Sequence, residues 1–229
     1  IFSYLDEEYE LPKGCILITN DKKLHRYLYM FLLVWQHRSK LRDCDVLRVL
    51  QFPGIIPAIL SKLFFKTPVF VTYGYKYHEF ATLENKPIIA MLLKLLENTV
   101  LKYVDGVIVT TASLKKHVSQ FVNIKKIHLI PNGVDINLFK PAHKRFNPKD
   151  IRVISIGRLE IQKNYKNLIS AIGQSKYKEN INLTLVGNGS LKKEIELLVT
   201  DLEVNLKIID VLPHNKLPKL LQKQDLFVL

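Results

Sequence analysis

The chain has 229 residues, of which 48% are hydrophobic, and its formal net charge is +13. This length and hydrophobic fraction are enough for one large α/β domain or two smaller ones, and they exclude a disordered chain. A positive charge that is spread along the chain suits anionic small molecules, an anionic membrane surface or nucleic acid, without choosing among them.

Short β-rich runs alternate with longer helical patterns through the first part of the chain. The predicted strands are 14–20, 45–51, 67–73, 105–111 and 125–131, and the predicted helices are 22–39, a segment after Pro53, 85–103 and 112–121. Strands that are separated by helices in this rhythm predict βαβ units and a parallel sheet.

A break follows at residues 132–150, where Asn-Gly, two prolines and several cations predict a linker. The alternation then resumes, with strands at 151–157, 181–187, 206–211 and 225–229 and helices at 164–176, 189–202 and 215–223. We therefore predict an α/β fold of two Rossmann-like parallel-sheet lobes, with domain boundaries 1–142 and 143–229. Ligands of such folds bind at the carboxyl ends of the strands.

Two segments bear on the compartment. Cys15 opens an apolar run, which predicts a buried, reduced thiol and a reducing, cytoplasmic location. The apolar stretch 27–35 is far shorter than the roughly 20 residues of a membrane span, and cations flank it on both sides. A buried helix is the plainer interpretation, and the alternative is a helix that also rests on the inner face of a membrane.

Two loops at predicted strand ends are candidates for an anion site. Arg158 and Lys163 follow Gly157 and precede a helix, where free N–H groups and the helix dipole favour negative charge. A solvated loop is the alternative. Gly187-Asn188-Gly189 follows the next strand, and it is either a tight turn or a turn small enough for a ligand to approach the backbone.

The loop Tyr73-Gly74-Tyr75-Lys76-Tyr77-His78-Glu79 follows another strand and is dense in hydrogen-bonding groups. Its tyrosines could stack on a sugar face or form a structural rim. We favour function, because loops at strand carboxyl ends tend to carry it. His78 is the only side chain there whose ordinary pKa is near neutral.

Other classes of site are not supported by the sequence. Asp43 and Asp45 have the D-x-D spacing of a metal site, but they lie at the start of a strand, so we interpret them as turn caps. No other group of side chains has metal-ligand spacing, and the motifs imply no cofactor. The charge would suit nucleic acid, but no nucleic-acid-binding motif accompanies it.

Four blocks together resemble the retaining GT-B glycosyltransferases of family 4. They are IPNGVDINLFKP (130–141), ISIGRLEIQKNYKNLISAI (154–172), LTLVGNGSLKKEIELLV (183–199) and DVLPHNKLPKLLQKQDLFVL (210–229). TPVFVTYGY and VDGVIVTT match the amino-terminal lobe of the family more loosely. No single block is specific, but their combination and order are.

The resemblance implies a sugar transfer from a UDP- or GDP-sugar to a glycan or lipid-linked acceptor, with retention. Arg158 and Lys163 would grip the donor diphosphate beside Gly157, and Gly187 and Gly189 would lie near the donor. Val211, Leu212 and His214 would hold the nucleobase, and Tyr73, Gly74 and Tyr75 would lie on the acceptor side.

The family's E-x7-E motif and its amino-terminal glycine-rich loop have no counterpart in the sequence. We therefore expect a fragment truncated at both ends, with an incomplete second lobe, whose catalytic residue is unassigned and for which His78 is the candidate. A sugar-nucleotide epimerase of the same fold and a catalytically incomplete nucleotide-sugar-binding module are the alternatives to a transferase.

Overall fold

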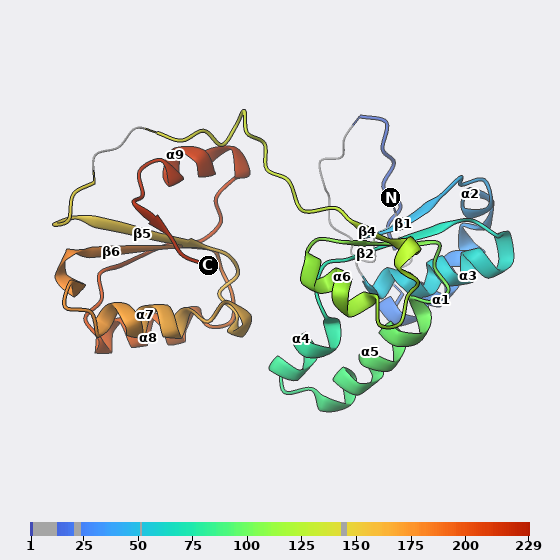
Figure 1. Ribbon diagram of the computed structural model, residues 1–229, viewed down its shortest axis with the longest axis horizontal. Coiled ribbons are helices and arrows are strands. Elements are labelled where there is room, and N and C mark those ends of the chain that lie inside the picture. The colour runs from blue at the N-terminus through green and yellow to red at the C-terminus, as the bar shows by residue number, and fades with distance from the viewer. Residues whose placement is uncertain (2–12, 21–23, 51, 143–145) are drawn as a thin grey trace. The chain divides into compact units, whose positions relative to one another are not determined.

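The computed structural model describes residues 1, 13–20, 24–50, 52–142 and 146–229. The chain forms two compact units, Ile1–Asn132 and Gly133–Leu229 (Figure 1). The boundary predicted after residue 142 falls inside the second unit as the contacts define it. Residues 22, 23, 51 and 143–145 of the predicted elements lie outside the described residues.

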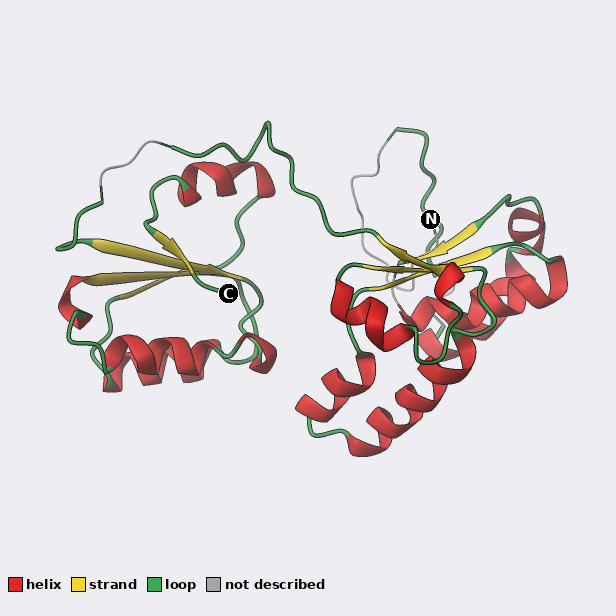
Figure 2. Cartoon of the chain, viewed as in Figure 1, coloured by secondary structure: helices red, strands yellow, loops and turns green. Residues whose placement is uncertain are grey.

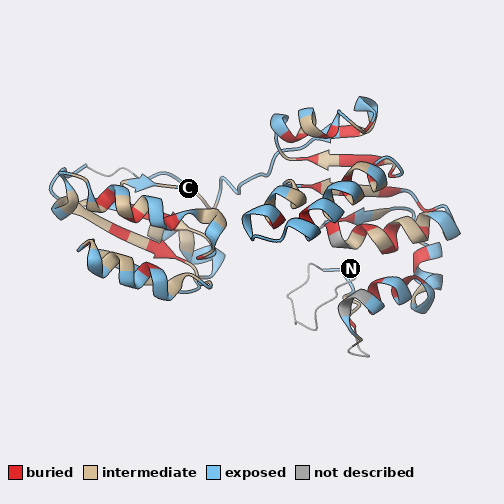
Figure 3. Ribbon diagram, turned by 90° about the horizontal axis from the view of Figure 1, so that it is seen from below, coloured by how far each residue is buried: buried red, intermediate tan, exposed pale blue. Residues whose placement is uncertain are grey.

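The first unit is built on a four-stranded parallel sheet of order β1-β2-β3-β4. The strands are β1 (Leu47–Val49), β2 (Val69–Tyr73), β3 (Gly106–Val109) and β4 (Ile127–Leu129). The helices are α1 (Arg26–Gln36), α2 (Arg38–Arg42), α3 (Ile55–Phe65), α4 (Tyr77–Leu83), α5 (Pro87–Val100) and α6 (Ala112–Val118). Alternate residues of β2 and most of β3 are buried, as expected for a parallel sheet covered by its crossover helices (Figure 3).

The second unit contains another four-stranded parallel sheet, of order β7-β6-β5-β8. Its strands are β5 (Ile151–Ile156), β6 (Ile181–Val186), β7 (Leu206–Ile209) and β8 (Leu226–Phe227), and its helices are α7 (Tyr165–Gly173), α8 (Lys192–Asp201) and α9 (Leu217–Leu221). Helices α7 and α8 cover one face of this sheet and α9 covers the other (Figure 2). The predicted α/β fold of two parallel-sheet lobes is therefore confirmed.

The first predicted strand, 14–20, is wrong. Within it only Ile18 forms a bridge, and the Ile18 N–H donates to the Ile1 carbonyl at 2.8 Å. A β-rich run becomes a strand only where a neighbour offers it a ladder to pair with. For the same reason Cys15 is exposed, and the prediction of a buried thiol is wrong.

Two further boundaries differ from the predictions. The helix predicted at 22–39 breaks at His37, where α1 ends and α2 begins. The loop expected through Glu79 turns helical at Tyr77, so His78 lies in the first turn of α4. The backbone N–H of His78 is satisfied by a carboxylate from another helix, which the local sequence could not reveal.

Asp105 ties three elements of the first unit together just before β3. Its carboxylate accepts hydrogen bonds from Lys62 Nζ of α3 at 2.5 Å and from the Val69 N–H of β2 at 2.8 Å. Burial alone would raise the pKa of Asp105, but these hydrogen bonds and the nearby lysines lower it. The carboxylate therefore holds α3 and β2 in place in its ionised form.

We predict that Asp105→Ala lowers the free energy of unfolding by about 1.5–3 kcal/mol, the range for hydrogen bonds to a charged group. Urea unfolding at neutral pH measures the loss. Because the pKa is lowered in the folded state, this stabilisation is present above the unfolded value of about 3.9 and is lost as pH falls below it. The difference from wild type should therefore shrink in acid. Asp43→Ala is the control, since among the described residues Asp43 forms an ion pair only with exposed Arg42, and its loss should cost under about 1 kcal/mol.

Candidate functional site

The carboxyl edge of the second sheet gathers most of the predicted donor residues. The loops after β5, β6 and β7 all leave the sheet at this edge, because the strands are parallel. The strand order reverses between β5 and β8, since β6 lies on one side of β5 and β8 on the other. In open α/β sheets such a reversal marks the crevice in which ligands bind.

Backbone hydrogen bonds join the loops after β5 and β6. The Gly157 N–H donates to the Val186 carbonyl at 2.9 Å, and the Leu159 N–H donates to the Asn188 carbonyl at 3.0 Å. The Leu191 N–H then donates to the Leu159 carbonyl at 3.0 Å. Leu159 itself is fully buried, so the paired loops are anchored in the core of the second unit.

The two glycines of the β6 loop allow this pairing. A Cβ on Gly187, whose φ is +147°, would lie 2.0 Å from the Gly157 carbonyl oxygen. A Cβ on Gly189 would lie 2.4 Å from the Leu159 carbonyl oxygen. The missing side chains therefore make room for the neighbouring loop, which is a structural role that the sequence alone did not distinguish from ligand approach.

Glu160 is the acidic residue of the β5 loop, and its carboxylate is bound by the β6 loop. Its carboxylate accepts hydrogen bonds from the Ser190 N–H at 3.0 Å and from Ser190 Oγ at 2.7 Å. The hydrogen bond from the Ser190 N–H, followed by that from Oγ, lowers the pKa of Glu160. The carboxylate thus serves as a further link between the two loops.

Arg158 and Lys163 make no ion pair with any described residue. The Arg158 side chain is exposed, and Lys163 Cε lies 3.0 Å from where a Cβ on Gly157 would stand. Asn164 then begins α7 in the left-handed conformation, with φ +52° and no hydrogen bond from its side chain to the helix. Two unpaired cations beside an uncapped helix start can bind an anion such as a diphosphate.

Other lysines of the second unit do form ion pairs. Lys192 pairs with Asp210 at 2.6 Å and Lys166 pairs with Glu194 at 2.6 Å. The lack of a partner at Arg158 and Lys163 is therefore not a general feature of the lysines and arginines in this part of the chain.

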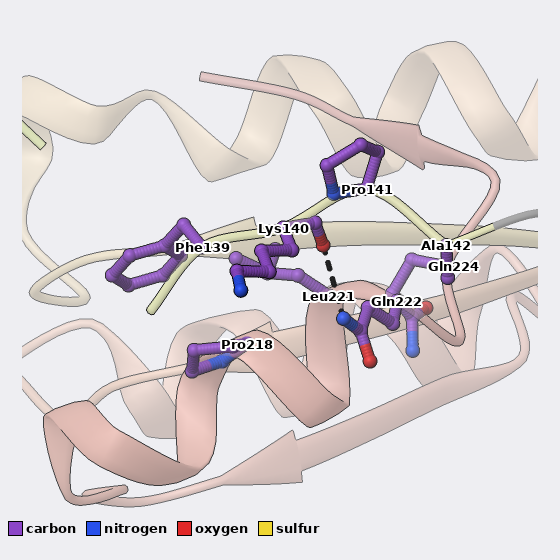
Figure 4. A pocket seen from close by; sticks show the side chains of 8 residues that line it. All are labelled: Phe139, Lys140, Pro141, Ala142, Pro218, Leu221, Gln222 and Gln224. Atoms are coloured by element: carbon purple, nitrogen blue, oxygen red, sulfur yellow. Dashed lines mark hydrogen bonds between the residues drawn. The ribbon is translucent and has the colours of Figure 1, made fainter. Parts of the chain in front are cut away.

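The loop after β7 carries the remaining donor candidates. Val211 is 80% exposed, Leu212 is half-buried, and His214 packs its ring edge-on against Phe139 at 5.1 Å between centroids. A groove of about 360 Å³ lies between residues 139–142 and α9 (Figure 4). Gln222 Nε2 donates to the Lys140 carbonyl at 3.0 Å across this groove, but none of the predicted donor residues lines it.

In the first unit, the predicted tyrosines differ sharply in exposure. Tyr73 is fully buried, with its ring among those of Phe52, Tyr77 and His117, so it offers no face to a sugar. Tyr77 is half-buried, its hydroxyl accepts the Phe52 N–H at 3.0 Å, and burial raises its pKa to about 12. The ring of Tyr75 is 49% exposed and stacks on Tyr77 at 4.2 Å between centroids.

Gly74 precedes Tyr75, and a Cβ there would meet nothing within 4 Å. His78 lies two residues beyond Lys76, and its Nδ1 is 2.6 Å from the carboxylate of Glu97, a residue that we did not predict. Glu97 shares the buried face of its helix with Ala90 and Leu101, but its partner lies 19 positions away, so no local sequence pattern marked it. A carboxylate on such a face requires a partner.

The described part of the chain lacks two other kinds of feature. No three His, Cys, Asp or Glu side chains come together in a way that could hold a metal ion there. Nor does any described helix combine the length and the apolar character that crossing a membrane requires.

Family models match the chain from residue 6 to its last residue. The model described as "Glycosyltransferase Family 4" matches residues 6–138, more than half of the chain, and the one described as "Glycosyl transferases group 1" matches residues 138–229. The chain belongs to glycosyltransferase family 4.

Individual proteins also resemble this family 4 chain. An N-acetylgalactosamine-N,N'-diacetylbacillosaminyl-diphospho-undecaprenol 4-alpha-N-acetylgalactosaminyltransferase of Campylobacter jejuni is 30% identical over 89 residues, which are 38% of this chain and 24% of the relative. HepE of Anabaena, solved with UDP and glucose, superposes with a TM-score of 0.70 at 18% identity over 93% of this chain and 59% of its own.

Sucrose-phosphate synthase of Thermosynechococcus elongatus superposes with a TM-score of 0.76 at 15% identity, over 99% of this chain and 63% of its own. At these identities the solved structures show the shared GT-B fold alone. The chain thus spans about a quarter of the curated relative and about three-fifths of the solved ones.

For this family 4 chain, we predict that Gly187→Ala destabilises the second unit. The new methyl group would overlap the Gly157 carbonyl, and overpacking of this kind costs about 1–3 kcal/mol. The urea midpoint of unfolding measures the effect. Gly133→Ala, at a glycine with nothing within 4 Å, is the control and should leave the midpoint unchanged. Equal midpoints for the two variants would contradict the close loop pairing.

Proposed function

We propose that the protein transfers a sugar from a nucleotide-sugar donor to a glycan or lipid-linked acceptor, with retention at the anomeric carbon. The observation that carries the proposal is the pair of unpaired cations, Arg158 and Lys163, at the strand-order reversal of the second sheet. The family supports it, as does the activity named for the Campylobacter relative.

The proposed reaction needs a cationic clamp. When the bond between the sugar and the diphosphate breaks, negative charge develops on the leaving nucleoside diphosphate, and fixed donors stabilise it. The Arg158 guanidinium can bind two phosphate oxygens at once, and Lys163 adds a point charge. The Glu160 carboxylate makes its hydrogen bonds to Ser190 and forms no ion pair with either cation of the clamp.

The other donor contacts follow from the same arrangement. Gly157, Gly187 and Gly189 shape the loops beside the clamp, and we propose that Val211, Leu212 and His214 hold the base of UDP or GDP. In the first unit, the exposed ring of Tyr75 and the backbone at Gly74 are the proposed acceptor contacts, and His78 is the candidate catalytic group. Tyr73 is buried and packs against Tyr77, which in turn contacts Tyr75.

The clamp is tested in the complete protein. We predict that Arg158→Ala and Lys163→Ala each weaken UDP or GDP binding in calorimetry by about tenfold or more, because a charge-assisted hydrogen bond contributes about 1.5–3 kcal/mol. Lys193→Ala removes an equal charge from an exposed site on α8 and is the control. Sugar transfer from mixed UDP- and GDP-sugars should fall in parallel.

The same assay separates the alternatives. An epimerase would convert the nucleotide-sugar without any acceptor, and a binding module would bind nucleotide without converting it. Unchanged nucleotide affinity in both clamp variants would remove these two residues from the site.

We also propose a peripheral contact with an anionic membrane from its cytoplasmic side, through the surface formed by α1 and α3. Trp35 of α1 and Phe64 of α3 are 52% and 58% exposed, and their rings meet edge-on at 5.3 Å. Other exposed apolar side chains on these helices are Leu28, Phe31 and Leu63. The exposed cations on or near these helices are Arg38, Lys40, Arg42 and Lys66. Aromatic side chains with nearby cations suit the interface of an anionic bilayer.

Trp35 is the single tryptophan of the chain, so its fluorescence reports on this contact. We predict a blue shift of the emission with phosphatidylglycerol vesicles and little shift with phosphatidylcholine vesicles. Phe64→Ser should weaken vesicle binding several-fold, whereas Tyr177→Ser, at a similarly exposed aromatic residue of the second unit, should not. Equal loss in both variants would argue against the α1 and α3 surface.

A further inference from the structure

Glu97 is a fully buried carboxylate in the last turn of α5. Burying an isolated carboxylate costs too much free energy, so the groups that bind Glu97 must compensate for its burial and they indicate its role. Both of its oxygens bind one residue of the adjacent helix α4. Oε1 accepts the His78 backbone N–H at 3.2 Å, and Oε2 lies 2.6 Å from His78 Nδ1.

The backbone contact explains how α4 begins. The first N–H groups of a helix lack partners inside the helix, and a side chain at the N-cap usually satisfies one of them. Lys76 at the N-cap of α4 makes no such hydrogen bond. The Glu97 carboxylate takes this role from α5, which lies beside α4 in Figure 1. The same carboxylate therefore fixes the backbone and the ring of His78.

The ring contact fixes the tautomer of His78. An ionised carboxylate can only accept hydrogen bonds, so Nδ1 must carry the proton that lies between the two groups. In the neutral imidazole the other nitrogen, Nε2, is then an acceptor. Nε2 makes no hydrogen bond with a described residue and is not among the buried unpaired atoms, so it is at least partly accessible to solvent.

The titratable groups around His78 do not change the role of Nε2 as a hydrogen-bond acceptor. Tyr73 from β2 stays protonated, because burial and the Glu97 charge raise the pKa of its hydroxyl. His117 from α6 stays neutral, because burial, followed by the charges of Lys76 and His78, lowers its pKa. On α4 itself, Lys76 and Glu79 neutralise each other in an ion pair of 2.5 Å.

We propose that Glu97 is a positioning residue that presents His78 Nε2 as a hydrogen-bond acceptor for a sugar hydroxyl, an inference that rests on the proposed sugar transfer. His78 lies just past the carboxyl end of β2, the edge of a parallel sheet at which ligands bind. An acceptor at this point binds hydroxyl groups and disfavours phosphate oxygens, which also only accept. The first unit would thereby select the hydroxyl-bearing part of a substrate.

Glu97→Gln tests this through a forced change of tautomer. The backbone N–H of His78 can only donate, so the amide oxygen of the substituted side chain must take it. The amide NH₂ then faces Nδ1, which must become the acceptor, and the ring proton moves to Nε2. The substitution keeps the side-chain shape but turns Nε2 from an acceptor into a donor.

The measurement is the two-bond nitrogen–proton correlation spectrum of protein labelled with ¹⁵N-histidine, at about two units above the ordinary imidazole pKa of about 6.5. His78→Asn assigns the signal among the seven histidines. We expect the Nδ1–H tautomer in the wild-type protein and the Nε2–H tautomer in Glu97→Gln. Glu84→Gln, an equal change in the exposed pair with Lys86, should keep the wild-type pattern. An Nε2–H tautomer in the wild type, which needs no variant to fold, would overturn the proposal.

The substrate contact is tested by kinetics in the complete protein. A hydrogen bond of about 0.5–1.5 kcal/mol predicts a fall of roughly 2- to 13-fold in kcat/KM for Glu97→Gln, with Glu84→Gln unchanged. A changed tautomer with unchanged kcat/KM would overturn the contact with the sugar hydroxyl. Absence of transfer in every protein, with the expected tautomers, would instead count against the proposed function, because the spectra require no substrate.

Discussion

A parallel strand can join its neighbour only through a crossover, and in nearly all proteins that crossover is right-handed. In the second unit the steps from β5 to β6 and on to β7 run in one direction across the sheet, so α7 and α8 lie on one face. The return to β8 runs in the opposite direction and places α9 on the other face. The chain therefore leaves β5 toward one face of the sheet and enters its neighbour β8 from the other. The cations of the β5 loop lie at this reversal of strand order.

The position of the β5 loop depends on its neighbour. The hydrogen bonds between the two loops, the close approach at Gly187 and the carboxylate of Glu160 all hold it against the β6 loop. None of these contacts involves the side chain of Arg158 or of Lys163. The backbone is thus held by groups other than the cations, whose side chains remain available to an anion. In the first unit Glu97 has a comparable role, since it holds His78 through Nδ1 and leaves Nε2 available.

The sequence predicted the strands and helices of both sheets well, because hydrophobic periodicity reports burial directly. It failed at 14–20, where Ile16 and Ile18 resemble strand residues but, among the described residues, pair only with Ile1. Roles that depend on distant partners were also hidden. Gly187 faces a loop about 30 residues away in the chain, and Glu97 is 19 residues from His78, so no local pattern could separate packing from ligand contact. Arg158 and Lys163 were found because their chemistry is local to one loop.

The paired loops also restrict how the protein can diverge. Three backbone hydrogen bonds and the Ser190 contacts tie residues 157, 159 and 160 to residues 186, 188, 190 and 191 in a fixed register. One inserted residue in either loop would shift this alignment and bring a side chain to the place that Gly187 leaves empty. The lengths of the two loops are therefore coupled, because a change in one of them alone breaks the register that both share.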